Sequence, residues 1–412
     1  MTAQELTIKA KDGGAFSGYL ALPEGGSGPG LVIAQEIFGI NHVMREAADR
    51  FAEEGYVALV PDLFWRIEPG LDLGYSEEDW QKAFGLFQKF DVDKGVEDMG
   101  AALEALAGLA ECTDGPAVLG YCLGGKLAYL TACRHQPKAA IGYYGVGIEE
   151  SLDEAANITC PTVLHIAGED QFVPPEAIAK IESSLADHPH VTTYVYPGAD
   201  HAFAREGEDH YNRPAALVAN SRTLKCLKDQ MGPHFDLEAI WDEHTKLEFV
   251  DHDADRTMDT MVAEPYVNHI PTMTGGVGKE LLHRFYKYHF IPTLPEDTAL
   301  TSISRTVGVD RVVDEMIFSF THTTEIDWML PGIAPTGKRV EIPLVAIACV
   351  RGGKLYHEHI YWDQASVLVQ IGLLDPEGLP IAGIETSNKV VDKNLQSNEL
   401  MTNWPKIEGK PL

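Results

Sequence analysis

The chain has 412 residues, of which 45% are hydrophobic, and its formal net charge is −30 at pH 7. This length favours two compact domains over one. The excess of negative charge argues against a nucleic acid or an anionic membrane surface as partner, because both require a positively charged protein surface.

Secretion and membrane insertion are not expected. No apolar run reaches the roughly 18 residues needed to cross a bilayer. The N-terminal stretch MTAQELTIKAKDGG lacks the basic and apolar regions of a secretion signal. The six cysteines, at positions 112, 122, 133, 160, 226 and 349, include no C-x-x-C pair. We therefore expect a cytoplasmic protein without a disulfide framework, a metal site or a cofactor.

Short apolar runs alternate with helical stretches up to about residue 230. The runs that predict strands are 30–36, 56–62, 116–121, 139–145, 160–168 and 190–198. Helical spacing occurs at 41–55, 93–109, 126–135 and 174–188. Continuous rather than alternating hydrophobicity is typical of parallel strands covered on both faces. This order predicts an open α/β sheet with an active site at the carboxyl ends of its strands.

The composition changes near KDQMGPHFDLEAI, where Gly232 and Pro233 end the last helix of the first region. We place the domain boundary there, giving domains 1–232 and 233–412. Helical stretches at about 235–251, 255–265 and 277–290 precede long strand-like segments at 315–329 and 340–363. Helices followed by a run of strands predict an α+β domain with a curled antiparallel sheet.

Cys122 stands in the stretch GYCLG, between a predicted strand and a predicted helix. This is the G-x-S-x-G pattern of a nucleophile elbow, with cysteine in place of serine. The helix N-terminus would favour the thiolate. The alternative is a small hydrophobe buried where strand meets helix, since free cysteine is among the most buried residue types.

An elbow nucleophile requires an acid and then a histidine on later loops. Asp170 follows the strand at 160–168, and His201 follows the strand at 190–198. Glu169 is the competing acid. The order Cys122, Asp170, His201 predicts a triad in which the acid orients the histidine and the histidine transfers the proton.

Residues 1–230 resemble the dienelactone hydrolase (carboxymethylenebutenolidase) family of the α/β-hydrolase fold. The stretches that carry the resemblance are QEIFGIN (35–41), FQKFD (87–91), GYCLGG (120–125), YYGVG (143–147), GEDQFVP (168–174) and DHAFAR (200–205). The resemblance implies a small-molecule ester or lactone substrate, which can carry a carboxylate, and a thioester intermediate on Cys122. It also implies that Glu36 lies against the nucleophile and helps to deprotonate it when substrate binds.

The same resemblance assigns the remaining site residues of this domain. The backbone N–H groups of Ile37 and Leu123 would form the oxyanion hole. Arg205 would bind a substrate carboxylate, with a surface salt bridge as the alternative, and Phe38 and Trp80 would contact substrate. Family members that act on diene-lactones use a second arginine where this chain has Trp80. The resemblance therefore leaves open whether the substrate is larger or more apolar than a diene-lactone.

From about residue 240 the chain resembles the SnoaL-like polyketide-cyclase group of cone-shaped α+β folds. The stretches are PTMTGGVGKELLHRFY (271–286), FSFTHTTEIDWMLPGIAPTGKRVEIP (318–343) and GKLYHEHIYWDQASVLVQIGLL (353–374). The resemblance implies an apolar pocket, with His322, His359 and Asp363 as candidate pocket residues. His357 shares a strand face with His359, but no third ligand supports a metal there. Asp363 has the alternative of a cap before QASVLVQ.

Three functions remain open from the sequence. The first is a cysteine-dependent ester or lactone hydrolase with an accessory pocket domain. The second is a bifunctional enzyme whose cone domain isomerises or cyclises the product. The third is a non-catalytic binding or oligomerisation protein. The second resemblance also implies a homo-oligomer formed through the C-terminal domain.

Overall fold

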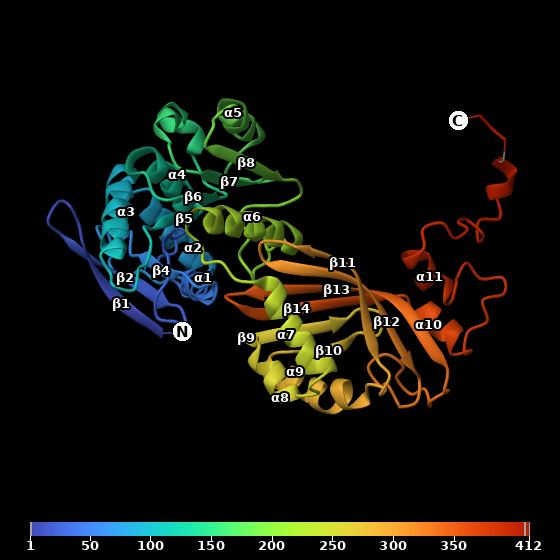
Figure 1. Cartoon of the computed structure of the whole chain (residues 1–412). Coiled ribbons are helices and arrows are strands. Elements are labelled where there is room, and N and C mark those ends of the chain that lie inside the picture. Colours follow the sequence, from blue (N-terminus) through green and yellow to red (C-terminus); the bar gives the residue numbers. More distant parts are fainter. Residues whose placement is uncertain (1, 408, 412) are drawn as a thin grey trace. The chain divides into compact units, whose positions relative to one another are not determined.

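The computed structural model of the chain describes residues 2–407 and 409–411. It divides into two compact units, Met1–His234 and Phe235–Leu412, each with its own hydrophobic core. Figure 1 labels their helices and strands. Among the described residues, no helix is both long enough and apolar enough to cross a membrane.

The first unit is built on a sheet whose eight strands, within the described residues, have the order β1-β2-β4-β3-β5-β6-β7-β8. The strands are β1 (Thr2–Lys9), β2 (Ala15–Leu22), β3 (Gly30–Ala34), β4 (Val57–Pro61), β5 (Ala117–Tyr121), β6 (Ala140–Tyr143), β7 (Thr162–Ala167) and β8 (Val191–Tyr196). From β4 to β8 all neighbours are parallel, whereas β1 and β2 form an antiparallel edge. This is the α/β-hydrolase type of sheet that the sequence predicted.

Each of the six predicted parallel strands falls inside its apolar run, and almost every residue of β3 to β7 is buried. The edge strands β1 and β2 were not predicted. Much of β1 is exposed, so its sequence carries no continuous apolar run. Their pairing therefore depends on the β1–β2 hairpin and on contact with β4.

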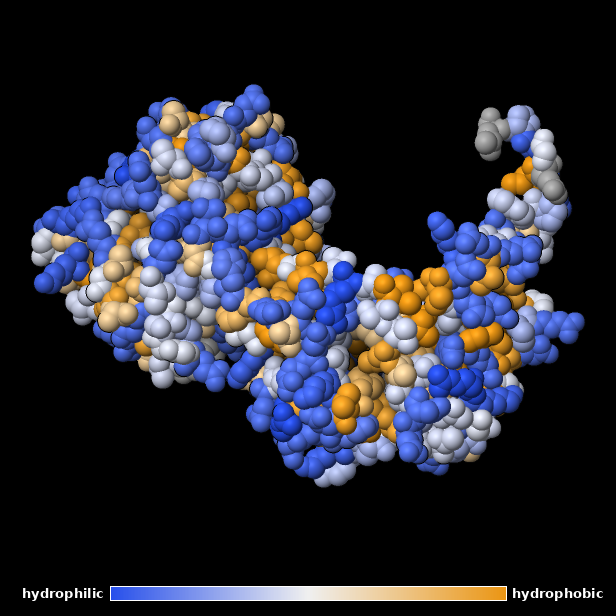
Figure 2. Space-filling view, in the orientation of Figure 1, coloured by the Kyte–Doolittle hydropathy of each residue, from blue (hydrophilic) through white to orange (hydrophobic). Residues whose placement is uncertain are grey.

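From β3 onward, each strand of this sheet is followed by one or more helices or 3-10 turns. The helices are α1 (His42–Glu53), α2 (Glu77–Phe87), α3 (Val92–Ala107), α4 (Leu123–His135), α5 (Pro175–Leu185) and α6 (Arg213–Met231), with short 3-10 turns at Ile148–Glu150 and Leu152–Asn157. Asn41, Ser76, Asp91 and Asn212 cap α1, α2, α3 and α6 by accepting a backbone N–H of the first turn. Polar side chains cover most of the visible face of this unit (Figure 2).

The second unit is an α+β fold around a six-stranded sheet, counted over the same described part of the chain, with the order β10-β9-β14-β13-β12-β11. The strands are β9 (Met261–His269), β10 (Thr274–Val277), β11 (Ala299–Val307), β12 (Arg311–Thr321), β13 (Arg339–Arg351) and β14 (Lys354–Trp362). Neighbours are antiparallel except for the parallel pair β9 and β14.

Helices α7 to α9 precede most of this sheet in the chain. The helices of the unit are α7 (Leu237–Phe249), α8 (Ala254–Asp259), α9 (Lys279–Phe285), α10 (Gln364–Gln370) and α11 (Glu385–Val391), with a π-helical turn at Tyr286–Phe290 and 3-10 turns at Ile291–Thr293 and Trp404–Ile407. The helix expected at 255–265 is found only as far as Asp259, where α8 ends, and β9 begins at Met261. The strand expected at 315–329 also ends early, at Thr321.

Candidate active site

Cys122 lies on the sharp turn between β5 and α4. Its φ of 55° and ψ of −117° place it in a strained region that side chains rarely adopt. A Cβ on Gly120 would lie 1.9 Å from the carbonyl oxygen of Gly124, and a Cβ on Gly124 would lie 2.2 Å from that of Ala34. Both glycines are therefore required for strand and helix to approach this closely.

His201 and Asp170 meet at the carboxyl ends of β8 and β7. His201 Nδ1 lies 2.7 Å from Asp170 Oδ2, and Asp170 Oδ1 accepts a hydrogen bond from the backbone N–H of Phe172 at 2.8 Å. Both triad side chains are buried, whereas the competing acid Glu169 is exposed. The acid that contacts the histidine is therefore Asp170.

Cys122 and His201 interact directly. Burial lowers the pKa of His201, but the charge of Cys122 and hydrogen bonds with Asp170 and Cys122 together raise it to about 10. The imidazolium is favoured because two negative groups flank the ring. Cys122 itself is partly exposed.

Glu36 and Arg205 form a buried ion pair. Arg205 Nη2 donates to Glu36 Oε2 at 2.7 Å, and the two residues are 5% and 1% exposed. The guanidinium also lies 4.3 Å from the ring centre of Tyr75. The alternative of a surface salt bridge for Arg205 is wrong, because the pair is enclosed. Arg205 Nε and Glu36 Oε1 have no hydrogen-bond partner among the described residues.

Tyr144 connects this ion pair with the nucleophile. Its ring centre lies 5.0 Å from that of His201. Burial raises the pKa of the Tyr144 hydroxyl, and the charges of Glu36 and, to a smaller extent, Cys122 raise it further. Both charges are therefore close to one phenol. Tyr144 was not predicted as a site residue, although it stands in the family stretch YYGVG.

A chain of aromatic contacts connects Phe38 with His201. Phe38 makes edge contacts with Tyr75 and Trp80, with ring centres 4.7 and 4.9 Å apart. Trp80 stacks on Phe172 at 6.5 Å, and Phe172 contacts His201 at 4.8 Å. Tyr75 and Phe172 were not predicted, because an aromatic residue in a loop carries no sequence signal for where its ring points.

The arginine nearest in sequence to Trp80 does not replace the missing second arginine. Arg66 is held by Asp98 and Asp12, with Nη2 to Asp98 Oδ1 at 2.8 Å and Nη1 to Asp12 Oδ2 at 2.6 Å.

The two predicted oxyanion donors are backbone groups. Ile37 follows β3, and Leu123 is the first residue of α4, where a helical N–H has no intrahelical partner.

The three candidates in the second unit are not among the residues that line the cavity described next. Asp363 is exposed and accepts the N–H of Ala365 at 2.9 Å as the cap of α10. His322 is buried in the loop after β12 and accepts the N–H of Thr336 at 3.3 Å. His359 neighbours His357 and Tyr266, with ring centres 4.9 and 5.6 Å away. A role of these residues in a pocket therefore stays a prediction.

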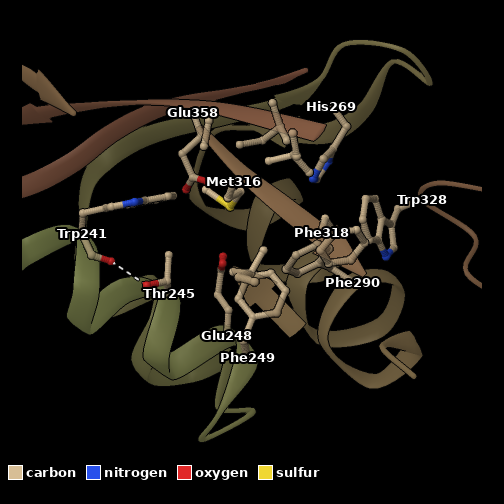
Figure 3. A pocket seen from close by; sticks show the side chains of 14 residues that line it. Trp241, Thr245, Glu248, Phe249, His269, Phe290, Met316, Phe318, Trp328 and Glu358 are labelled. Carbon is tan, nitrogen blue, oxygen red and sulfur yellow. Dashed lines mark hydrogen bonds between the residues drawn. The ribbon is translucent and has the colours of Figure 1, made fainter. Parts of the chain in front are cut away.

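The cavity of the second unit is mainly aromatic, with acidic groups at one side. It is lined by Trp241, Thr245, Glu248, Phe249, His269, Phe290, Leu300, Met316, Phe318, Trp328, Leu344, Ala346, Glu358 and Ile360. In Figure 3 the carboxylates of Glu248 and Glu358 point into it from α7 and β14. These two acids were missed. The spacing His244-x-x-x-Glu248 places two polar side chains on one face of α7, and it is the sequence signal that could have indicated Glu248.

Among the described residues, one group offers three possible metal-ligand atoms within 4.8 Å of one another, namely His244, Glu248 and Glu358. All three are buried. Burial lowers the pKa of His244, but the two carboxylates together raise it to about 10. Burial also raises the pKa of Glu248.

Comparisons with known proteins agree with the division of the chain into two units. A model of the dienelactone hydrolase family matches residues 16–231, and a model of SnoaL-like polyketide cyclases matches residues 244–371. A "Putative carboxymethylenebutenolidase" of Azospirillum brasilense is 44% identical over 232 residues, which cover 55% of this chain and 99% of that protein.

Two further relatives are similar over the same share of the chain. The "Carboxymethylenebutenolidase" of Pseudomonas sp. (strain P51) is 39% identical, covering 55% of this chain and 96% of its own length. The "Carboxymethylenebutenolidase 1" of Cupriavidus pinatubonensis is 36% identical, covering 55% and 97%. Each alignment therefore spans nearly a whole relative.

Proposed function

The chain belongs to the dienelactone hydrolase family, and from this premise we propose that it hydrolyses carboxylic esters or lactones with Cys122 as its nucleophile. The observation that carries the proposal is the chain of contacts from Cys122 through His201 to Asp170. Asp170 lies 2.7 Å from the imidazole, and the imidazole interacts with the sulfur on a strained turn.

In the acylation step the Cys122 thiolate attacks the carbonyl carbon, and a tetrahedral oxyanion forms. The N–H groups of Ile37 and Leu123 stabilise this oxyanion, each by about 3 kcal/mol in the transition state. The C–O bond then breaks, and the leaving alkoxide takes the proton from the His201 imidazolium. The product of this step is a thioester on Cys122.

In the deacylation step His201 acts as the base. The thioester sulfur carries no charge, so the contribution that raises the pKa of His201 is lost and a neutral imidazole is favoured. This imidazole takes a proton from water, and the hydroxide attacks the thioester. Collapse of the second tetrahedral intermediate expels the thiolate and releases the carboxylic acid.

Substrate recognition depends on the Glu36–Arg205 pair and on the aromatic side chains of Phe38 and Trp80. A substrate carboxylate can replace Glu36 on Arg205, whose Nε still has a free hydrogen-bonding position. Trp80 and Phe38 favour an unsaturated or aromatic acyl or leaving group, since they offer flat apolar surface at this position.

Stopped-flow hydrolysis of p-nitrophenyl acetate and of a small enol-lactone tests the proposal, with intact mass analysis of the quenched enzyme. We expect an acyl adduct on Cys122, and a loss of kcat of at least about 10³-fold in Cys122→Ala. Cys226→Ala is the matched control, because loss of this other partly exposed thiol should leave both the adduct and the turnover unchanged.

Two results would overturn the mechanism. One is an adduct that persists in Cys122→Ala. The other is turnover of wild type without any adduct on rapid quenching, combined with full activity of the alanine variant. A wild type that is folded, by circular dichroism, but neither turns over nor forms an adduct would favour the binding or oligomerisation protein instead.

A further inference from the structure

A buried cluster of two carboxylates and one imidazole lies beside the cavity of the second unit, which its two glutamates line. His244 and Glu248 are four residues apart on α7, and Glu358 comes from β14. His244 Nε2 lies 3.1 Å from a carboxylate oxygen of each glutamate. Among the described residues, no lysine or arginine nitrogen lies within 4.0 Å of either glutamate. Two buried carboxylates therefore face a single imidazole, which is costly in an apolar setting.

The hydrogen bonds around His244 fix which of its nitrogens carries the hydrogen. Thr260 donates its hydroxyl hydrogen to the carbonyl oxygen of Thr257 at 2.6 Å. Thr260 Oγ1 can therefore only accept from His244 Nδ1, which lies 2.6 Å away. A neutral His244 then presents the lone pair of Nε2 to two carboxylate oxygens. This arrangement requires a cation between the three groups, either a proton or a metal ion.

The distances fit a metal ion. Ligand atoms about 2.1 Å from a tetrahedral or octahedral ion are about 3.0–3.4 Å from one another when they occupy neighbouring positions. The two separations of 3.1 Å fall in this range. The Thr260 contact on the far nitrogen of His244 is the outer contact that metal-bound histidines commonly make. Tyr286 supplies another, since its hydroxyl donates to Glu358 Oε1 at 3.2 Å and lies 3.4 Å from His244 Nε2.

A second observation on the same cavity points to a ligand. His269 Nδ1 and Trp328 Nε1 line the cavity, are buried and have no hydrogen-bond partner among the described residues. In Figure 3 both rings lie across the cavity from Glu248. The space open to the centres of water-sized molecules is about 40 Å³, enough for a few waters. Solvent or a small ligand on an ion held by the glutamates could therefore reach these two atoms.

We propose that His244, Glu248 and Glu358 bind one divalent transition-metal ion of the Zn²⁺ or Mn²⁺ type, with its remaining coordination positions facing the cavity. One imidazole with two carboxylates suits such ions better than Mg²⁺ or Ca²⁺, which prefer oxygen ligands alone. A dication neutralises both glutamates, whereas one proton on Nε2 leaves a negative charge. This site would be separate from the hydrolytic residues of the first unit.

Equilibrium dialysis of the chelator-treated full-length chain against Zn²⁺ or Mn²⁺, with metal counted by mass spectrometry, tests the site. We expect wild type to retain one ion more per chain than Glu248→Gln/Glu358→Gln at the same free metal concentration. Each single variant should bind about tenfold more weakly or worse. Glu243→Gln is the matched control, because Glu243 lies on the exposed side of the same helix. It also reports adventitious uptake by the acidic surface.

Equal uptake by wild type and the double variant overturns the proposal, as does a wild type that takes up no ion. In the second case a buried proton holds the cluster together, and Glu248→Gln should then unfold no more easily than wild type. If the double variant fails to fold, electron spin resonance of Mn²⁺ with wild type decides alone. One bound ion with nitrogen coupling from a single imidazole supports the site, and only hydrated Mn²⁺ refutes it.

Discussion

At the scale of single residues, His201 has to do opposite things in the two halves of the proposed reaction. It must hold a proton while Cys122 is a thiolate and release it once the sulfur is acylated. The pKa of His201 changes between the two halves because the charge on the neighbouring sulfur changes. Burial favours the neutral ring, and the Cys122 charge together with Asp170 outweighs it.

This balance predicts the effect of Cys122→Ala on His201. Without the sulfur the imidazolium loses one of its two negative neighbours, while burial and Asp170 remain. The pKa of His201 should therefore fall below its wild-type value of about 10. Nuclear magnetic resonance titration of the chain carrying ¹⁵N-labelled histidine measures it, with His201→Gln to assign the signal. Cys226→Ala should leave the titration unchanged, and an unaltered pKa in Cys122→Ala would contradict the proposed ion pair.

The Glu36–Arg205 pair shows what single residues cannot reveal in sequence. The two positions are 169 residues apart, and each alone reads as a surface charge or a substrate contact. Only the fold shows that they form a buried ion pair beside Tyr75 and Tyr144. A buried pair of this kind contributes little net stability. Its orphaned Nε and Oε1 atoms fit a role in exchanging partners with substrate better than a role in holding the fold.

At the scale of elements, the turn from β5 into α4 sets the position of the nucleophile, and two glycines set the turn. In Gly124→Ala the new methyl group would meet the Ala34 carbonyl at 2.2 Å, and β3 has no room to retreat. We expect the free energy of unfolding to drop by about 1–3 kcal/mol or more. Esterase activity should drop further than stability, since Cys122 moves with the helix.

Gly85 provides the matched comparison. It lies inside α2, and a Cβ there would meet nothing within 4 Å. Gly85→Ala should therefore raise the free energy of unfolding by about 0.5–1 kcal/mol, because alanine loses less conformational freedom in a helix. Urea unfolding of both variants measures the pair. A neutral Gly124→Ala would mean that the elbow is not set by this contact.

The elements also mark how far the sequence could predict the structure. Continuous apolar runs located the parallel strands, and strand ends then located Cys122, Asp170 and His201, because one topology accounts for all of them. At 255–265 the apolar residues Met258, Met261 and Val262 have helical spacing, yet β9 begins at Met261 and pairs with β14. Tertiary pairing there overrides the local pattern.

The second unit shows a different limit. The candidates His357 and His359 lie on one face of β14, whereas Glu358 and Ile360, which line the cavity, lie on the other face. Side chains alternate along a strand, so choosing the wrong face exchanges every pocket residue for its neighbour. Which face is covered depends on α7 and on the loop that contains Trp328, and both are distant in sequence.

At the scale of the whole molecule, the charge is the property that no single site explains. The chain carries 62 acidic and 32 basic residues, so 30 negative charges have no basic counterpart. Self-repulsion of this excess opposes the compact state. Most of the ion pairs in the structure are at least partly exposed, and exposed pairs are worth about 0–1 kcal/mol each. Their loss on screening should therefore be smaller than the relief of repulsion.

We expect the melting temperature to rise by a few degrees as NaCl increases from about 0.01 to 0.15 M, while the Debye length falls from about 30 to 8 Å. The rise should flatten above this range, because enclosed pairs such as Glu36 and Arg205 are hardly screened. Differential scanning calorimetry in NaCl and in KCl of equal ionic strength separates screening from ion-specific effects, which would differ between the salts. A melting temperature that falls over the same interval would mean that the exposed ion pairs, rather than the excess of carboxylates, dominate the electrostatic free energy of the folded chain.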